Sequence, residues 1–457
     1  MDLLSGNLNF ALPLLQAQGR TGWSVPVGLA YNSQNWRQDN SVNWQLAGDL
    51  GYGFGWKLAI GSITPYYTGW TNGVDHYVFT DGSGAEYLLN VKSGNVWSSS
   101  QGVYVWLDTT LSPYKLHFKD GSFWQMGCTS GGNEFDAGTM YPTIVEDTYG
   151  NQVLVTYEAG SGLASTAVNS SSRIATIEDV RGNGSADYTF TYNTDSPVPH
   201  LTGIANSIGT AETYGLTYTA SSLGPPFGTD PTYSGLTTTL LTGMTVPTAN
   251  AWQFGYDSAG AGELLSAISP YGGELSWNYA SFAYIGSRSL REVSARYVAA
   301  DSAHATQWTY GISRPDAANS VIVHSAVTLS DASGVGSKTW SFLNTSGTPA
   351  WEMGLLSELV EKPSPSSSTI FRDTTSTWSQ DPASNPYIST TVKVIDEGTS
   401  NQQMSLILRP GPLRSSDLAH PGKRSTASDG TCVTLNSDSS TQLRGAAVDN
   451  WPADRID

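Results

Sequence analysis

Alternating apolar and polar residues dominate the middle of the chain and predict β-strands. Five segments share one order: a short apolar run, a polar turn, and an alternating strand that closes on tyrosine. Every second side chain of such a strand lies on one face. In one closing strand, Thr189 and Thr191 separate the aromatic residues. The five segments are Thr143–Tyr157, Arg173–Tyr192, Leu201–Tyr218, Leu241–Tyr256 and Leu264–Tyr279.

The spacing of the closing tyrosines indicates a repeat. Glycine lies at four of the five turns and supplies positive φ at little steric cost, while the fourth turn uses Pro247 and Asn250. Units of roughly 20–50 residues stack on their neighbours, because one hairpin cannot bury its apolar face alone. We therefore predict an all-β fold of stacked antiparallel β-hairpins, with a β-sandwich or propeller as the alternative. The repeat anchors are Tyr157, Tyr192, Tyr218, Tyr256 and Tyr279.

Composition narrows the classes of function. Charged residues make up 13% of the chain, and the formal net charge is −17. An acidic surface repels phosphate backbones and anionic membranes, so we expect no nucleic-acid partner. No apolar run approaches the ~18 residues of a membrane span. Cys128 and Cys432 are too few for a disulfide framework, and we expect both to be incidental rather than bridged.

At the level of motifs, the chain resembles a known repeat family. The pattern Ile-x-x-(Asp/Ser)-x-x-Gly-x(5–9)-Tyr resembles the YD repeat of RHS proteins. The segments Ser5–Leu14, Val25–Gln34 and Gly51–Trp56 resemble the opening region of bacterial RHS-repeat proteins. The resemblance covers roughly residues 1–400. It implies an RHS/YD-repeat β-shell, open or incomplete in this chain, that encloses a C-terminal effector such as a toxin in a secreted or surface-displayed protein.

Four regions are expected: an N-terminal β region (1–130), the hairpin repeats (131–285), further shell strands (286–403) and a tail (404–457). Asp381-Pro382 is not followed by the x-Gly-Leu of the family's self-cleavage motif, so we expect the front part of a longer polypeptide. The tail loses the alternation, and is either a disordered, frameshifted end or a polar linker. The Ser/Thr/Asn/Gly-rich composition predicts an extracellular or cell-surface location, with the signal peptide upstream.

Candidate catalytic groups do not converge in the sequence. The six histidines are scattered and are expected at the surface or at strand ends, and no G-x-S-x-G elbow occurs. The pairs Glu146-Asp147 and Glu178-Asp179 recur at equivalent places. Adjacent strand residues point to opposite faces, and an Asp before a turn bonds its own backbone two residues on. We therefore predict turn roles for these carboxylates and no enzyme activity.

Two glycine-rich stretches are candidate ligand loops. The oxygen-bearing residues Asp179, Asn183 and Asp187 resemble a calcium loop, but Arg181 stands where an oxygen ligand belongs, which favours a hairpin turn. The G-x-G-x-G run at residues 51–55 lacks the helix and the lysine of a phosphate loop. Close packing around its aromatic residues is the favoured interpretation, and no cofactor is expected.

Tryptophans in turn-rich stretches are the remaining lead. They either stack on sugar rings or, as favoured, fill the inner wall of the shell. The sequence therefore predicts a non-catalytic shell segment whose partner is the C-terminal effector domain of a longer polypeptide. The alternatives are a carbohydrate-binding or adhesin module on cell-surface glycans, and a carbohydrate-active β enzyme. The candidate glycan-stacking residues are Trp36, Trp44, Trp70, Trp97 and Trp106.

Overall fold

The computed structural model describes residues 2–407 and 432–436, apart from gaps at 41–42, 47, 68–72, 102, 165, 183, 228–234, 248–249, 259, 287, 305–306, 346, 382–385 and 397–400. Regular structure in this part of the chain is β-strand, with 3-10 turns η1 (Arg20–Gly22), η2 (Gly162–Ala164) and η3 (Ser302–His304). The predicted all-β class is confirmed. Among the described residues, no helix has the length and apolar character needed to cross a membrane.

Two small sheets come from the first third of the chain. The N-terminal sheet contains β1 (Asn9–Gln18), β2 (Ser24–Asn32) and β5 (Trp56–Ala59) in the order β1-β2-β5. The second small sheet contains β6 (Ser62–Tyr67), β7 (Val74–Thr80), β8 (Glu86–Leu89), β14 (Cys128–Thr129) and β15 (Met140–Tyr141).

The remaining strands form one long main sheet. Its first part contains β9 (Val91–Ser93), β10 (Val96–Ser98), β11 (Val105–Asp108), β12 (Tyr114–Phe118), β13 (Phe123–Met126), β16 (Ile144–Glu146), β17 (Gln152–Tyr157), β18 (Ile174–Glu178), β19 (Tyr188–Tyr192), β20 (Leu201–Asn206) and β21 (Tyr214–Leu223). It continues through β22 (Leu236–Thr245), β23 (Trp252–Tyr256), β24 (Leu264–Ile268), β25 (Glu274–Tyr284), β26 (Arg288–Ala299), β27 (Trp308–Ser313) and β28 (Ala326–Asp331). The last strands are β29 (Ser337–Phe342), β30 (Leu356–Lys362), β31 (Arg372–Gln380), β32 (Pro386–Asp396), β33 (Asn401–Ile407) and β34 (Cys432–Asn436), while β3 (Trp36–Asn40) and β4 (Asn43–Leu46) join as a branch on β26.

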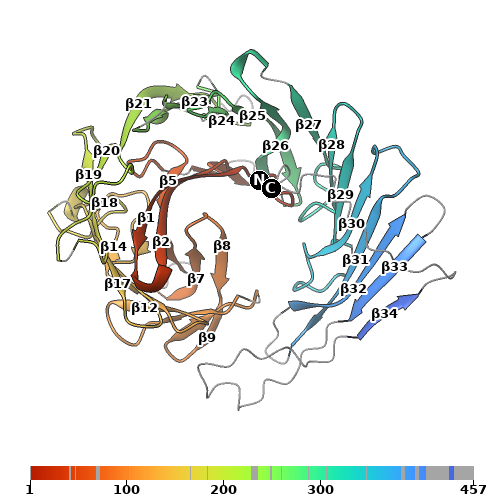
Figure 1. Ribbon diagram of the computed structural model, residues 1–457, viewed down its shortest axis with the longest axis horizontal. Helices are drawn as coiled ribbons and strands as arrows, with labels where there is room; N and C mark the ends of the chain where they lie inside the picture. Colours follow the sequence, from red (N-terminus) through yellow and green to blue (C-terminus); the bar gives the residue numbers. More distant parts are fainter. Residues whose placement is uncertain are drawn as a thin grey trace.

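Strand order in the main sheet follows the sequence. Neighbours pair antiparallel from β9 to β34, with β13 passing directly to β16. No ladder among the described strands joins β34 back to β9, so the sheet is open. Figure 1 shows it curving around the N-terminal strands β1, β2 and β5, which lie inside the curve.

The five predicted hairpins are the pairs β16–β17, β18–β19, β20–β21, β22–β23 and β24–β25. Their closing strands alternate as expected. Tyr188 and Phe190 are buried, while Thr189 and Thr191 between them are exposed. The apolar face of these strands points toward the N-terminal sheet, which covers and buries it.

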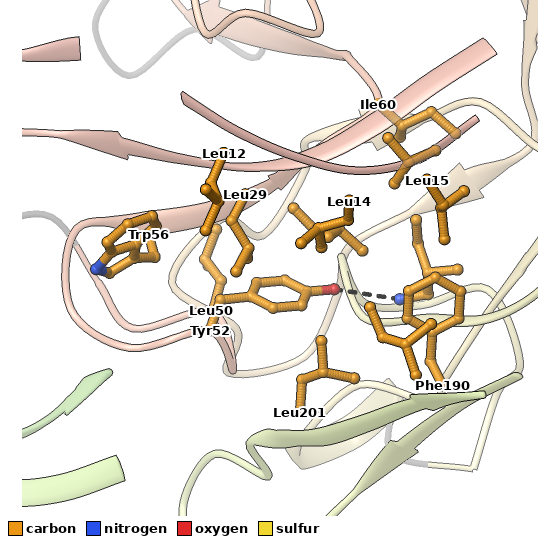
Figure 2. Packing of buried hydrophobic residues seen from close by; sticks show 14 of the residues in the cluster. Leu12, Leu14, Leu15, Leu29, Leu50, Tyr52, Trp56, Ile60, Phe190 and Leu201 are labelled. Atoms are coloured by element: carbon orange, nitrogen blue, oxygen red, sulfur yellow. Dashed lines mark hydrogen bonds between the residues drawn. The ribbon is translucent and has the colours of Figure 1, made fainter. Parts of the chain in front are cut away.

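One continuous core joins the N-terminal sheet to these hairpins. It combines Leu12, Leu14 and Leu29 of the small sheet with Phe190 and Leu201 of the repeats. Figure 2 shows these side chains meeting around Tyr52, which lies between the two layers. A separate core lies between β6–β8 and the inner face of β10–β13. The concave side of the main sheet is therefore filled along its first half.

The G-x-G-x-G run is the corner that brings β5 into this core. Gly51, Gly53 and Gly55 have φ of +99°, +91° and +82°, a region that favours glycine. A Cβ on Gly53 would lie 2.8 Å from the backbone nitrogen of Leu241. Tyr52 and Phe54 between these glycines, and Trp56 directly after them, are each 1% exposed. The expected packing role of this run is confirmed.

The expected tail mostly lies outside the described residues. Where described, residues 401–407 form β33 and residues 432–436 form β34, so strand structure continues past position 404. The nature of the tail and the four regional boundaries stay predictions.

Replacing Gly53 with alanine tests the close approach of this corner to β22. The left-handed backbone costs about 1–2 kcal/mol for any L side chain, and the contact with Leu241 adds roughly 1–3 kcal/mol of overpacking. The control is Gly150→Ala, at φ +81° with nothing within 4 Å of its Cβ, which carries the backbone cost alone. Urea unfolding should show a clearly larger loss for Gly53→Ala; equal losses would contradict the packing argument.

Candidate functional site: the tyrosine anchors of the curved sheet

Each closing tyrosine lies at a β-bulge. The register of the ladder shifts at the tyrosine, which pairs with the first residue of the next strand in three units and with a mid-strand residue in the other two. A bulge adds one residue to one strand, bends it and interrupts the ladder. The pairs are Tyr157–Ile174, Tyr192–Leu201, Tyr218–Leu241, Tyr256–Leu264 and Tyr279–Val293.

The phenol of the tyrosine reaches back across its own hairpin. Tyr192 Oη donates to the carbonyl of Ile174 at 2.9 Å, and Tyr256 Oη donates to that of Leu241 at 2.7 Å. The same contact joins Tyr279 to Leu264 at 3.0 Å and Tyr157 to Pro142 at 2.8 Å. In four of the five units the hydroxyl therefore satisfies a main-chain carbonyl at the start of the hairpin and fastens the closing tyrosine to it.

Burial keeps these phenols protonated. Desolvation raises the pKa of Tyr157, Tyr192, Tyr218, Tyr256 and Tyr279 well above the ordinary tyrosine value. Each hydroxyl therefore stays a neutral donor. Tyr218 departs from the pattern, since its buried hydroxyl has no hydrogen-bond partner among the described residues.

Aromatic residues of the N-terminal region bond to the same row. Trp56 Nε1 donates to Tyr256 Oη at 2.8 Å. Tyr31 Oη accepts from the backbone nitrogen of Leu264 at 2.9 Å. Tyr52 Oη accepts from Ile174 N at 3.3 Å, the dashed contact in Figure 2, and lies 3.2 Å from Tyr192 Oη. Polar contacts as well as apolar packing therefore fix the position of the N-terminal sheet relative to individual hairpins.

A buried histidine fixes the glycine corner to β20. His200 Nε2 lies 2.8 Å from Asp49 Oδ2, and its Nδ1 lies 3.0 Å from Asp195 Oδ2. The other oxygen of Asp49 accepts from Gly51 N and Gly53 N. Burial disfavours the charged ring, but the two carboxylates outweigh it and raise the pKa of His200.

A second buried histidine, His324, lies next to β28. Its Nδ1 is 3.0 Å from Asp316, and its Nε2 is 3.1 Å from Glu292 on β26. Glu292 also accepts from Tyr284 Oη at 2.5 Å. The sequence predicts the histidines at the surface or at strand ends: His200, directly before β20, and His324, two residues before β28, lie at strand ends and are buried. Their carboxylate partners lie as far as 151 residues away in sequence, so no local motif revealed them.

The tryptophan candidates separate by exposure. Trp36 and Trp97 are each 4% exposed, and Trp36 Nε1 donates to Ala261 O at 2.7 Å, so neither indole offers a face to a sugar ring. Trp106 is 37% exposed. Trp70 and the side chain of Trp44 lie outside the described residues.

Asp147 and Asp179 accept hydrogen bonds within their own turns, whereas Glu146 lies on β16 opposite Gln152 of β17. Asp147 Oδ1 accepts from the backbone of Tyr149 at 2.8 Å, two residues on, as predicted. Glu146 accepts from the amide of Gln152 at 2.6 Å. Asp179 Oδ2 binds Arg181 Nη2 at 2.5 Å and Gln18 N at 2.6 Å, and Asp187 accepts from Asp179 N.

The described residues around the calcium candidate do not form a set of metal ligands. Asn183 lies outside the described residues. The guanidinium of Arg181 donates hydrogen bonds to both carboxylate oxygens of Asp179. Within the part of the chain that the structure describes, no three His, Cys, Asp or Glu side chains are placed to hold a metal ion. Cys128 is a buried free thiol whose pKa burial raises to about 12, while the side chain of Cys432 lies outside the described part.

Comparison with known proteins adds little. No family model matches the sequence, and no curated protein matches it. The solved N-terminal domain of effector protein SpvB from Salmonella typhimurium strain LT2 aligns at 10% identity and a TM-score of 0.25, over 85% of this chain and 99% of that one. The TcdB2-TccC3-Cdc42 structure aligns at 12% identity and a TM-score of 0.22, over 95% of this chain and 21% of that one. TM-scores this low describe only partial overlap of the folds, and they identify no function for this chain.

Tyr256→Phe should destabilise the protein by about 1–3 kcal/mol, because it leaves the Trp56 N–H and the Leu241 carbonyl without their partner. Tyr218→Phe is the matched control, since it removes a buried hydroxyl that bonds to nothing described, and should be neutral or stabilising. Urea unfolding at neutral pH measures both. Equal losses would show that the hydroxyl contact does not fasten the hairpins.

His200 should make stability depend on pH. Because its pKa is raised in the folded chain, the stabilisation is complete below the unfolded value of about 6.5 and is lost as pH rises through the folded value. The free energy of unfolding of the native protein minus that of His200→Gln should therefore shrink with rising pH. In Asp195→Asn, which removes one carboxylate, the loss should begin at lower pH. A difference independent of pH would contradict the assignment.

Proposed function

We propose that the chain is a non-catalytic wall segment of the RHS/YD-repeat kind, from a secreted or cell-surface bacterial protein. In the complete polypeptide the wall encloses or presents a C-terminal effector domain, such as a toxin. The curved open sheet, built from hairpins fastened in series, supports this proposal (Figure 1). Its mechanism is mechanical: hydrogen-bonded ladders and anchored tyrosines hold a concave surface in shape.

The observation that carries the proposal is the uneven covering of the concave face. Over the tyrosine hairpins this face is buried under the N-terminal sheet. The same face continues from Ile312 to Leu329, and from Val327 through Trp340 to Leu359. There Trp340 and Leu359 are only half-buried. A concave apolar surface left partly open is suited to contact an enclosed domain.

Protease protection tests enclosure in the gene product that carries this chain together with the sequence following it. The C-terminal domain should resist a protease that digests the same domain expressed alone. Gly53→Ala, which weakens the corner between the N-terminal sheet and β22, should speed its digestion, whereas Gly150→Ala should do so much less. A C-terminal domain digested at the same rate with and without the wall would contradict the proposal.

The enzyme alternative has its own test. The chain should release no product from a panel of polysaccharides. Turnover that disappears in Glu146→Gln or Asp179→Asn would replace the wall proposal with a carbohydrate-active β enzyme.

A further inference from the structure

Two rows of side chains cross the concave face of the second half of the main sheet. Residues directly opposite each other on neighbouring strands share a face, as do alternate residues of one strand. The first row is Val327, Trp340, Leu359, Thr374 and Lys393. The second row is Ile312, Leu329, Lys338, Glu361, Arg372 and Ile395. Ile312 packs against the core beneath the N-terminal sheet, so both rows lie on the inner side.

Charged side chains of β29–β31 are divided between the two faces. On the inner face, Lys338 Nζ lies 3.2 Å from Glu361 Oε1, and Arg372 Nη1 lies 3.7 Å from Glu361 Oε2. Two cations therefore share one carboxylate. Glu358 and Asp373 alternate with residues of the first row and lie on the outer face. The inner face of these strands is left with an excess of positive charge.

Two further cations on the inner face pair with no carboxylate of the described residues. Lys393 ends the first row, and Arg296 lies opposite Trp277 of the core. Burial lowers the pKa of Arg296. Asp331 lies two strands further along the row of Arg296, but its carboxylate accepts from Ser333 N at 2.7 Å within its own turn. In a chain of net charge −17, this positive inner surface is a local exception.

The apolar part of the same surface is partly open. Trp340 and Leu359 are half-buried. In Figure 1 the strands of the N-terminal sheet, which cover the tyrosine hairpins, lie away from β30–β32. A surface that combines half-buried apolar side chains with unpaired cations suits a partner that brings both apolar groups and carboxylates.

Resting on the function proposed above, we infer that the inner face of β26–β32 binds an acidic, apolar segment of the enclosed C-terminal domain. Apolar side chains of that segment contact Trp340 and Leu359, and its carboxylates pair with Lys393, Lys338 and Arg372. The two rows are two residues apart along each strand, about 7 Å, so one extended segment reaches both. A basic segment is disfavoured, because like charges brought together at an interface repel.

Fluorescence anisotropy on the full chain tests this with three labelled peptides of equal length. Each alternates leucine or phenylalanine with a polar residue, which is glutamate, glutamine or lysine. The salt concentration is ~0.15 M, where charges more than about 8 Å away are largely screened and the overall charge of the chain matters little. The glutamate peptide should bind most tightly, and further salt should weaken it.

Substitutions in the two rows separate the apolar and the charged contributions. Trp340→Ala should weaken binding of the glutamate peptide about tenfold. Lys393→Gln breaks no ion pair of the described residues and should weaken it about threefold, with little effect on the glutamine peptide. The matched control is Lys362→Gln, directly after Glu361 on β30 and on the outer face, which should leave binding unchanged. Thermal unfolding of each variant shows that the fold is retained.

Equal affinity for the glutamate and lysine peptides would overturn the inference. So would unchanged affinity in Trp340→Ala, an effect of Lys362→Gln as large as that of Lys393→Gln, or tighter binding of oligo-dT than of the glutamate peptide. Protease protection in the longer gene product keeps the two proposals apart. A C-terminal domain that is protected by a wall to which the glutamate peptide does not bind would overturn this inference alone, whereas an unprotected domain would contradict the wall itself.

Discussion

The hydrogen bond from the closing tyrosine of a hairpin to a carbonyl at its start, made in four of the five repeat units, is the contact on which the curved sheet depends. Each strand of the main sheet pairs only with its neighbours in the sequence, so contacts within a hairpin are needed to hold each unit together. The bulge at the tyrosine interrupts the ladder at that point. The phenol of the next closing tyrosine donates to a carbonyl at that bulge, as Tyr256 does at Leu241, the residue paired with Tyr218, and Trp56 of the N-terminal sheet bonds to the same phenol. One residue type thus closes the unit, joins it to the next, and meets the inner sheet.

The hairpins were predictable because their information is local. An alternating strand, a turn and a closing tyrosine lie within about twenty residues, and two-residue periodicity specifies which face is buried. The docking of the N-terminal sheet was not predictable. Tyr31 meets Leu264 across 233 positions, and no periodicity links such segments. The glycine run predicted tight packing, but its neighbours β20 and β22 emerged only from the structure.

Buried charges mark the places where distant segments meet. Arg173 pairs with Glu134 at 2.5 Å, and Arg291 pairs with Glu263 at 2.6 Å, both in largely buried surroundings. Such pairs add little net stability, because desolvation offsets the attraction, but separating one leaves an uncompensated charge. These pairs therefore disfavour any arrangement of the chain in which one charge of a pair is buried away from the other. The histidines escaped sequence reasoning for the same reason: a lone His200 is uninformative until Asp49 is placed beside it.

The bulge at every tyrosine also has a consequence for size. A bulge bends its strand and increases the local twist. Each hairpin therefore adds to the angle through which the main sheet curves as well as to the width of the sheet. The arc length of the wall and the angle through which it turns are then set together by the number of units. Insertion or deletion of one unit would therefore change the angle through which the sheet turns in a discrete step. The curvature of such a sheet can thus change only by whole hairpins.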